Sequence, residues 1–341
     1  MFVRLAKVPT LPKYPNQQPQ IATAAKFSPD GAHIAIVQHT SILLFDFPRL
    51  KAGLISTPTL VLHTSHTAPI SDLCWSPDSQ CIATASDDYT VEITHVALYG
   101  TLHRLVSHTA PVISLCYNHK GNLLFTSSMD ESIKIWDTLN GSLMKTISAH
   151  SEAVVSVDVP ADDSSILGSA SYDGLVRIFD AWSGHCLKTL TYDKDWKSET
   201  GVVPVTQIKF SVNGKFLLVK TLDGVVKLWD CIRGNVARTF NRADGEMEGN
   251  EESKRRVATV YSCGMDLMYT AKGPILVSGY EDGEIYCWEV STKKLVQVLQ
   301  QQEEMNDVHT VSPVISIDCF ENYMCSLALD NSCYLWQFQQ T

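Results

Sequence analysis

The sequence lacks several patterns that identify common classes of protein. Basic residues are scarce: 27 lysines and arginines face 37 aspartates and glutamates, for a formal net charge of −10. Affinity for nucleic-acid phosphates requires a basic face, so we predict no direct binding to nucleic acid. No apolar run reaches the length of a transmembrane helix, and residues 1–10 contain no signal-peptide core. We therefore expect a soluble, intracellular protein that does not enter a membrane.

Catalytic and metal-binding motifs are also missing. The ten cysteines include no CxxC pair, and several of them, such as Cys74 and Cys287, fall in segments with a strand pattern. This distribution favours buried, reduced thiols over a disulfide or zinc framework. The sequence has no phosphate-binding loop, HExxH or GxSxG motif, and no carboxylates at metal-ligand spacing. We predict no catalytic residues, no metal site and no cofactor.

An internal repeat dominates what is present. The stretch Ser169–Asp180 (SASYDGLVRIFD) predicts two strands joined by a tight turn at Asp173 and Gly174. Its copies place an aspartate six residues before an aromatic residue. The pairs are Asp130/Trp136, Asp173/Phe179, Asp223/Trp229, Asp282/Trp288 and Asp330/Trp336. An altered copy has Asp88 and Thr94 at these places.

The repeat has the period of a four-stranded β-propeller blade. His66, His108 and His150 each open a copy and are 42 residues apart, within the range of about 40–45 residues for such a blade. These six copies, with a further blade predicted from the strand patterns of residues 22–64, give seven blades. The last blade ends after its third strand, so we expect residues 2–6 to supply the missing outer strand. The predicted fold is all-β: a seven-bladed β-propeller closed by the N-terminal strand.

We expect residues 1–341 to form this single propeller. A linker rich in proline and glutamine is predicted at residues 7–20, and a charged loop insertion at 241–256. The loop is the most charged and least apolar stretch, and we interpret it as a solvent-exposed insertion. Contact with a partner through its acidic front and basic end is the alternative interpretation.

The recurring polar residues resemble a catalytic set, but we interpret them as structural. A catalytic site occurs once, whereas this set occurs three times at constant spacing. An opening histidine can reach the turn aspartate of its own blade, and a strand hydroxyl can bond to the aromatic ring. The predicted network consists of His66, His108, His150, Asp88, Asp130, Asp173, Trp136 and Trp229. The predicted hydroxyls are those of Ser86, Ser128 and Ser171.

A ligand site is expected at the mouth of the central channel. Two positions in a blade should line it: the third residue after the opening turn and the residue before the turn aspartate. The first set is Ser71, Ile113, Val155, Thr206 and Ile315, and the second is Asp87, Met129, Tyr172, Leu222, Glu281 and Leu329. An acid and an aromatic among apolar residues suit an arginine of a partner peptide. The alternative is that Met129, Leu222 and Leu329 fill the channel.

Longer stretches carry a resemblance to a known family. The repeat resembles that of WD40 propellers over essentially the whole chain. Ile70–Asp88, Ser171–Leu190, Lys209–Asp230 and Val277–Gln300 are similar to the seven-bladed propeller subunit of COMPASS/MLL-type complexes, which methylate lysine 4 of histone H3. The resemblance implies a non-catalytic scaffold in the nucleus. The implied partners are a SET-domain methyltransferase, a second WD40 propeller subunit, other complex subunits and the histone H3 tail.

The resemblance also implies a pocket at one channel mouth, which takes an arginine of the histone tail or of the methyltransferase in that family. Ser71, Asp87 and Tyr172 match the pocket. Ile113 and Met129 stand where the family has two aromatic residues that clamp the arginine. The aromatic clamp of the family is therefore not kept in this sequence.

At the opposite mouth, the family holds an acidic, apolar tail of the partner propeller. Asn213, Phe216 and Leu228 match that surface. Two other functions stay open at this point. One is an adaptor of another nuclear complex, such as a ubiquitin ligase or an RNA-processing assembly. The other is a propeller hydrolase that uses channel acids such as Asp87 and Glu281 with a metal.

Overall fold

The computed structural model describes residues 1–10, 20–54, 57–162, 165–191, 203–242, 260–301 and 312–339. Over these ranges the chain forms seven antiparallel sheets of four strands each and the short helix α1 (Phe47–Lys51). The fold is the all-β, seven-bladed β-propeller that the repeat predicted. The chain divides into two compact units. The first draws on Met1–Ser65, Arg242–Gly249 and Tyr261–Thr341, and the second on His66–Asn241 and Asn250–Val260.

The first unit contains blades one, six and seven. Blade one has the strand order β2 (Ala22–Phe27), β3 (His33–Gln38), β4 (Ser41–Asp46) and β5 (Leu60–His63). Blade six has the order β22 (Met265–Thr270), β23 (Gly273–Gly279), β24 (Glu284–Glu289) and β25 (Leu295–Gln300). Blade seven consists of β26 (Val314–Phe320), β27 (Tyr323–Ala328), β28 (Cys333–Phe338) and β1 (Phe2–Val8).

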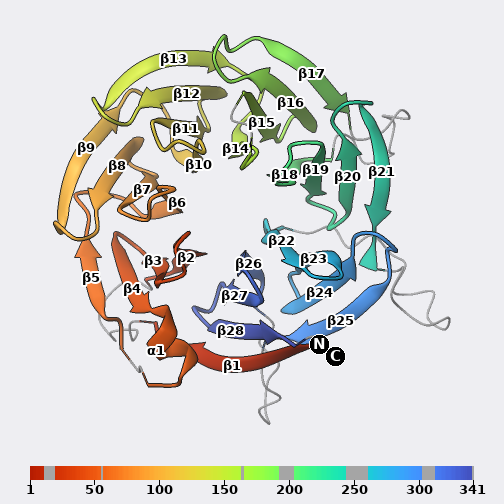
Figure 1. Ribbon diagram of the computed structural model, residues 1–341. Coiled ribbons are helices and arrows are strands. Elements are labelled where there is room, and N and C mark those ends of the chain that lie inside the picture. The colour runs from red at the N-terminus through yellow and green to blue at the C-terminus, as the bar shows by residue number, and fades with distance from the viewer. Residues whose placement is uncertain are drawn as a thin grey trace. The chain divides into compact units, whose positions relative to one another are not determined.

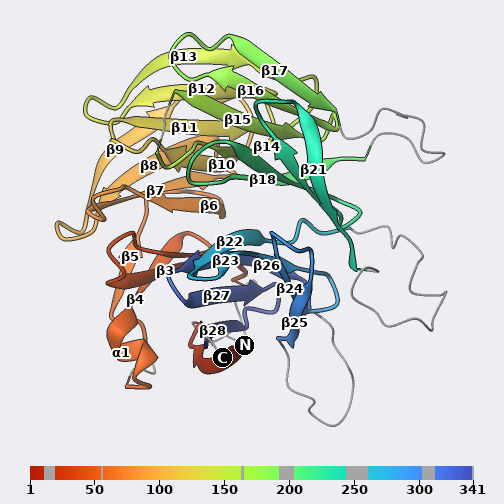
Figure 2. The same ribbon diagram turned by 45° about the vertical axis from the view of Figure 1, so that its right-hand side comes forward.

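Blade seven joins the two ends of the chain. β1 runs antiparallel to β28, with Phe2 opposite Phe338 and Val8 opposite Cys333, and Figures 1 and 2 show it along the edge of that strand. The Met1 amine also donates to the Gln339 carbonyl at 2.6 Å. The predicted closure by the N-terminal strand is confirmed. The strand continues two residues past the expected range, because Lys7 and Val8 also pair with β28.

The second unit contains blades two to five, which follow one another in chain order (Figure 1). Blade two is β6 (Ile70–Trp75), β7 (Cys81–Ser86), β8 (Thr90–His95) and β9 (Gly100–Val106). Blade three is β10 (Val112–Tyr117), β11 (Leu123–Ser128), β12 (Ser132–Asp137) and β13 (Ser142–Ser148). Blade four is β14 (Val154–Asp158), β15 (Ile166–Ser171), β16 (Leu175–Asp180) and β17 (Cys186–Thr191). Blade five is β18 (Val205–Phe210), β19 (Phe216–Thr221), β20 (Val226–Asp230) and β21 (Asn235–Phe240).

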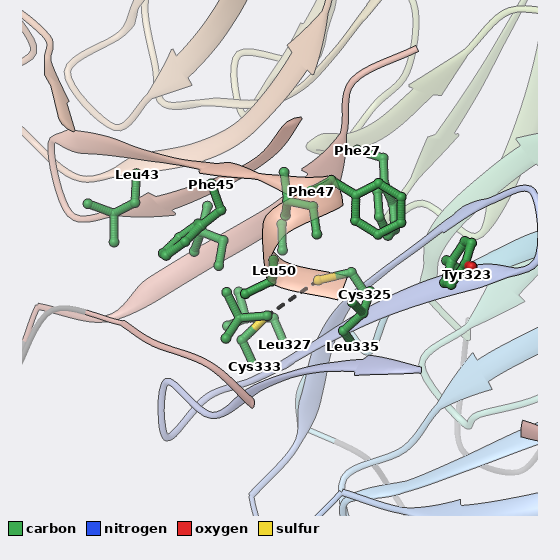
Figure 3. Close-up of a cluster of buried hydrophobic side chains, with 14 of the residues drawn as sticks. Phe27, Leu43, Phe45, Phe47, Leu50, Tyr323, Cys325, Leu327, Cys333 and Leu335 are labelled. Carbon is green, nitrogen blue, oxygen red and sulfur yellow. Dashed lines mark hydrogen bonds between the residues drawn. The ribbon is translucent and has the colours of Figure 1, made fainter. Parts of the chain in front are cut away.

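Apolar side chains pack between the sheets of each unit. In the first unit, residues of blades one and seven and of α1 form one buried cluster, shown in Figure 3. Full burial of a leucine or phenylalanine side chain contributes about 1.5–3 kcal/mol, so such clusters hold neighbouring blades together. Within this cluster the sulfurs of Cys325 and Cys333 lie 3.4 Å apart. All ten cysteines are free thiols.

Parts of the sequence-based predictions fall outside the described ranges. They are residues 11–19 of the linker and 243–256 of the charged loop. The assignment of residues 1–341 to one domain stays a prediction. In the part of the chain that is described, no helix has the length and hydropathy needed to cross a lipid bilayer.

Candidate functional site

A histidine, an aspartate, a hydroxyl and a tryptophan are bonded in series in blade three. His108 Nδ1 lies 2.7 Å from Asp130 Oδ2, and His108 Nε2 lies 2.8 Å from Thr126 Oγ1. The indole N–H of Trp136 donates to the same threonine hydroxyl at 2.9 Å. The side chains of His108 and Asp130 are 1% and 9% exposed. The network therefore fixes the blade hairpin and presents almost no surface to a substrate.

Blades two and four repeat the bonds of the histidine to the aspartate and to the hydroxyl, but Thr94 and Phe179 stand in place of the tryptophan. The equivalent pairs are His66–Asp88 (3.1 Å), His66–Thr84 (3.0 Å), His150–Asp173 (2.9 Å) and His150–Ser169 (2.7 Å). Blade five has no opening histidine, and there Trp229 packs in a buried apolar cluster. The recurring polar groups are thus used within the blades.

The hydroxyl in this network lies two residues before the one predicted. Ser128 donates instead to the Ala110 carbonyl at 3.0 Å and accepts the Asp130 N–H at 3.1 Å. Ser86 and Ser171 make the same kind of backbone bonds at their turns. The reason is register: Thr126 lies opposite Lys134, so Trp136 is its diagonal neighbour on the same face.

The turn aspartates are held in the charged state. Burial alone would raise the pKa of Asp88, but hydrogen bonds from Thr90 and the Thr67 amide, with the charge of His66, lower it to about 2. The pKa of Asp130 is also held well below its usual range. For Asp130 too, burial acts in the opposite direction, and the bond from His108 is the first of the groups that overcome it. These carboxylates are structural acceptors.

Five of the predicted channel positions are β-bulges. Pairing between the first two strands of the blade skips one residue of the innermost strand in each case. The skipped residues are Ser71, Ile113, Val155, Thr206 and Ile315. Thr23 in β2 is a further example that the sequence rule missed, whereas β22 pairs with β23 without a shift. Because a bulge leaves its extra residue unpaired and redirects the side chain, it suits a position that lines a site.

The residues predicted to bind arginine differ in how accessible they are. Asp87 and Met129 are exposed and Tyr172 is 42% exposed, whereas Ile113 is half-buried. The Ser71 hydroxyl donates to the Val112 carbonyl at 2.5 Å and to the Ala85 carbonyl at 3.3 Å. The Ser71 hydroxyl therefore links β6 to β10, and its proton is already used in bonds to the backbone.

Asp87 is the acidic residue among those predicted to bind arginine. Partial desolvation of its carboxyl group raises the pKa of Asp87, and the neighbouring charge of Asp88 adds to the effect. A cation placed beside Asp87 would relieve that repulsion. An accessible carboxylate can pair with a cation, and the exposed Tyr172 ring and Met129 side chain can contact its apolar stem. Leu222 in the second unit, and Glu281 and Leu329 in the first, are half-buried.

The predicted partner-tail residues occupy three different environments. Asn213 is exposed, and its side-chain oxygen accepts from the Ser211 hydroxyl at 2.9 Å and the Lys215 N–H at 3.1 Å. Phe216 is half-buried at the start of β19. Leu228 is only 7% exposed, so it lies in the core and not on the predicted surface. It sits in a central strand opposite the buried Leu218.

No group of three or more histidine, cysteine, aspartate or glutamate residues could hold a metal ion within the ranges that the structure describes.

Residues 57–94, 100–137, 141–180 and 184–230 match the family described as WD domain, G-beta repeat. The COMPASS component SWD3 of Saccharomyces cerevisiae is 60% identical over 319 residues, which cover 93% of this chain and 95% of that protein. Pre-mRNA-processing factor 19 of Oryza sativa subsp. japonica is 31% identical over 216 residues, covering 62% of this chain and 38% of that protein. The Denticleless protein homolog of Danio rerio is 25% identical over 294 residues, covering 80% and 38%. The chain therefore belongs to the family of WD40 propellers that includes the COMPASS component SWD3.

Proposed function

We propose that this chain is a non-catalytic scaffold subunit of a COMPASS-type histone H3 lysine-4 methyltransferase complex. The observation that carries the proposal is 60% identity to SWD3 along nearly the full length of both proteins. The hydrogen-bond networks support it, because the recurring histidines and aspartates are used within the blades. As a subunit of such a complex, the chain associates with its other subunits.

The finer assignment places one partner on each of two surfaces in the second unit. We expect a SET-domain methyltransferase to place an arginine at the mouth that carries Asp87, Met129 and Tyr172. We expect a second WD40 propeller subunit to bind near Asn213 and Phe216, and the histone H3 tail is a further expected partner. The exposure of Asp87 and Asn213 supports these roles, and assembly on chromatin would place the chain in the nucleus.

Affinity purification of the tagged chain from its own cells, followed by mass spectrometry, tests the proposal. Tyr172→Ala should reduce recovery of the methyltransferase, and Tyr269→Ala is its matched control, since the two tyrosines are 42% and 46% exposed. Asn213→Asp should reduce recovery of the second propeller. An aspartate keeps the acceptor for Ser211 and Lys215 while its charge repels an acidic tail.

Each outcome is decisive. Wild-type and Tyr269→Ala preparations that contain a SET-domain methyltransferase support the proposal. A wild-type preparation that contains a ubiquitin ligase or an RNA-processing assembly, and no methyltransferase, replaces it with the adaptor function. Normal recovery of both partners by Tyr172→Ala and Asn213→Asp removes the assignment of the two surfaces and leaves the scaffold role.

A further inference from the structure

The first unit contains an open cavity that none of the predicted sites uses. Its volume is about 590 Å³, and it lies among α1, the turn between β2 and β3, and the turn between β26 and β27. Phe47, Phe320 and Tyr323 form an aromatic wall, and three charged residues, Asp30, Lys51 and Glu321, also line it.

The aromatic wall is held firmly in place. The ring centroids of Phe47 and Tyr323 are 5.1 Å apart in an edge-to-face contact, and Phe320 stacks on Phe27 at 5.9 Å. A Cβ atom added at Gly31 would lie 2.5 Å from the Phe320 ring, so the turn backbone rests directly on that ring. Figure 3 shows Phe27, Phe47 and Tyr323 at the edge of the buried cluster. Phe320 itself is half-buried, which leaves part of its ring available to a ligand.

The charges favour a cation. The Asp30 carboxylate accepts from the Ser28 hydroxyl at 2.6 Å and the Ala32 N–H at 2.9 Å, which stabilise its ionised form. Glu321 is exposed, at a backbone φ of +49°. Among the described residues that line the cavity, the ammonium group is that of Lys51, which already lies 4.4 Å from the centre of the Tyr323 ring. The two carboxylates therefore outnumber the positive charge, and the wall is suited to cation–π contact.

We propose that this cavity binds a partner segment that presents an arginine beside a large apolar side chain. The apolar side chain would pack against Phe320 and Pro48, and the guanidinium would pair with Asp30 or Glu321. Arginine fits better than lysine, because its planar group can stack on an aromatic ring while it pairs with a carboxylate. The cavity lies wholly in the first unit, so the proposal does not depend on the function of the Asp87 mouth.

Methyl NMR of the full-length protein provides the test. Ala52 lines the cavity and is exposed, so its ¹³C-labelled methyl group reports occupancy. The probes are acetyl-Phe-Arg-amide, the uncharged acetyl-Phe-citrulline-amide and acetyl-Phe-Glu-amide. We expect a saturable shift of the Ala52 signal with the arginine peptide and at least about fivefold weaker binding of the citrulline peptide, equivalent to about 1 kcal/mol. Tighter binding of the glutamate peptide, or no shift at millimolar arginine peptide, overturns the proposal.

Matched variants connect the signal to the charges. Glu321→Lys should weaken the arginine peptide at least about fivefold, and Glu131→Lys should not. Both glutamates are exposed with positive φ, at +49° and +66°, and Glu131 lies in blade three. Lys51→Glu should tighten the same peptide about twofold or more. This opposite effect keeps the test valid if Glu321→Lys perturbs the fold, and weaker binding by Lys51→Glu contradicts the proposal.

Discussion

Replacing the turn aspartate of blade three should destabilise the protein far more than replacing the equivalent residue of blade six. In blade three, Asp130 accepts four hydrogen bonds: from His108 Nδ1 at 2.7 Å, the Thr109 N–H at 3.1 Å, and the N–H and hydroxyl of Ser132 at 3.0 and 2.6 Å. At about 1 kcal/mol for each bond, Asp130→Ala should cost about 4 kcal/mol. The buried His108 also loses the partner that orients it.

The comparison residue, Asp282, has weaker partners. It is 32% exposed, accepts the Glu284 N–H at 3.1 Å and pairs with Arg242. One backbone bond and an exposed ion pair together contribute about 1–2 kcal/mol. Asp282→Ala is therefore the matched control, with the same substitution at the same place in the repeat.

Urea unfolding at pH 7, followed by fluorescence and circular dichroism, measures both variants. The unfolding midpoint of Asp130→Ala should fall at least about twice as far as that of Asp282→Ala, with an unchanged slope. Equal shifts would refute the reasoning, because the histidine network would then add nothing to an ordinary turn.

The remaining predictions concern pH, tryptophan and glycine. Asp88 has a pKa of about 2 against an ordinary 3.8. Its ionised carboxylate therefore stabilises the fold fully above about pH 3.8, and this stabilisation is lost as the pH falls toward 2. The urea midpoint of the wild type should decline over this pH range, and that of Asp88→Asn should decline less steeply. Trp136→Phe removes an indole hydrogen bond and should cost about 1 kcal/mol more than Trp229→Phe, because the Trp229 indole makes no hydrogen bond to the described residues. Equal thermal shifts of the two variants would contradict this. Gly31→Ala should destabilise more than Gly53→Ala in calorimetry: both have positive φ, but only the first meets a ring. An equal loss of stability in the two variants would contradict this, because the positive φ that both glycines share would then explain the whole effect.

The repeat made the fold predictable, because its strands and turns are local signals that recur in seven sheets. The closure was predictable from strand pairing. The last blade had only three strands, and the strand predicted at residues 2–6 had no partner, so pairing the two completes the sheet. The identity of the bonding hydroxyl was not predictable. Thr126 and Ser128 both carry hydroxyls on the same face of a strand, and only the register against Trp136 separates them.

Burial and cavities were harder to predict for a different reason. Central strands of a blade are covered on both faces, so alternation along β20 does not distinguish a surface leucine from a buried one, and Leu228 was wrongly expected at the surface. The cavity of the first unit combines Asp30 and Glu321, which are nearly 300 residues apart in sequence. No local pattern connects two turns at that separation.

The pairing of β1 with β28 has a consequence for biosynthesis. β1 leaves the ribosome long before its partner, because β1 spans Phe2–Val8 and β28 spans Cys333–Phe338. At translation rates of about 5–20 residues per second, β1 waits roughly 20–70 s before it can pair. Blade seven is therefore the last of the seven sheets to be completed, and β1 can pair with other strands throughout that time. A nascent chain that stalls before residue 338 cannot complete this pairing, so closure also reports that translation has passed that point.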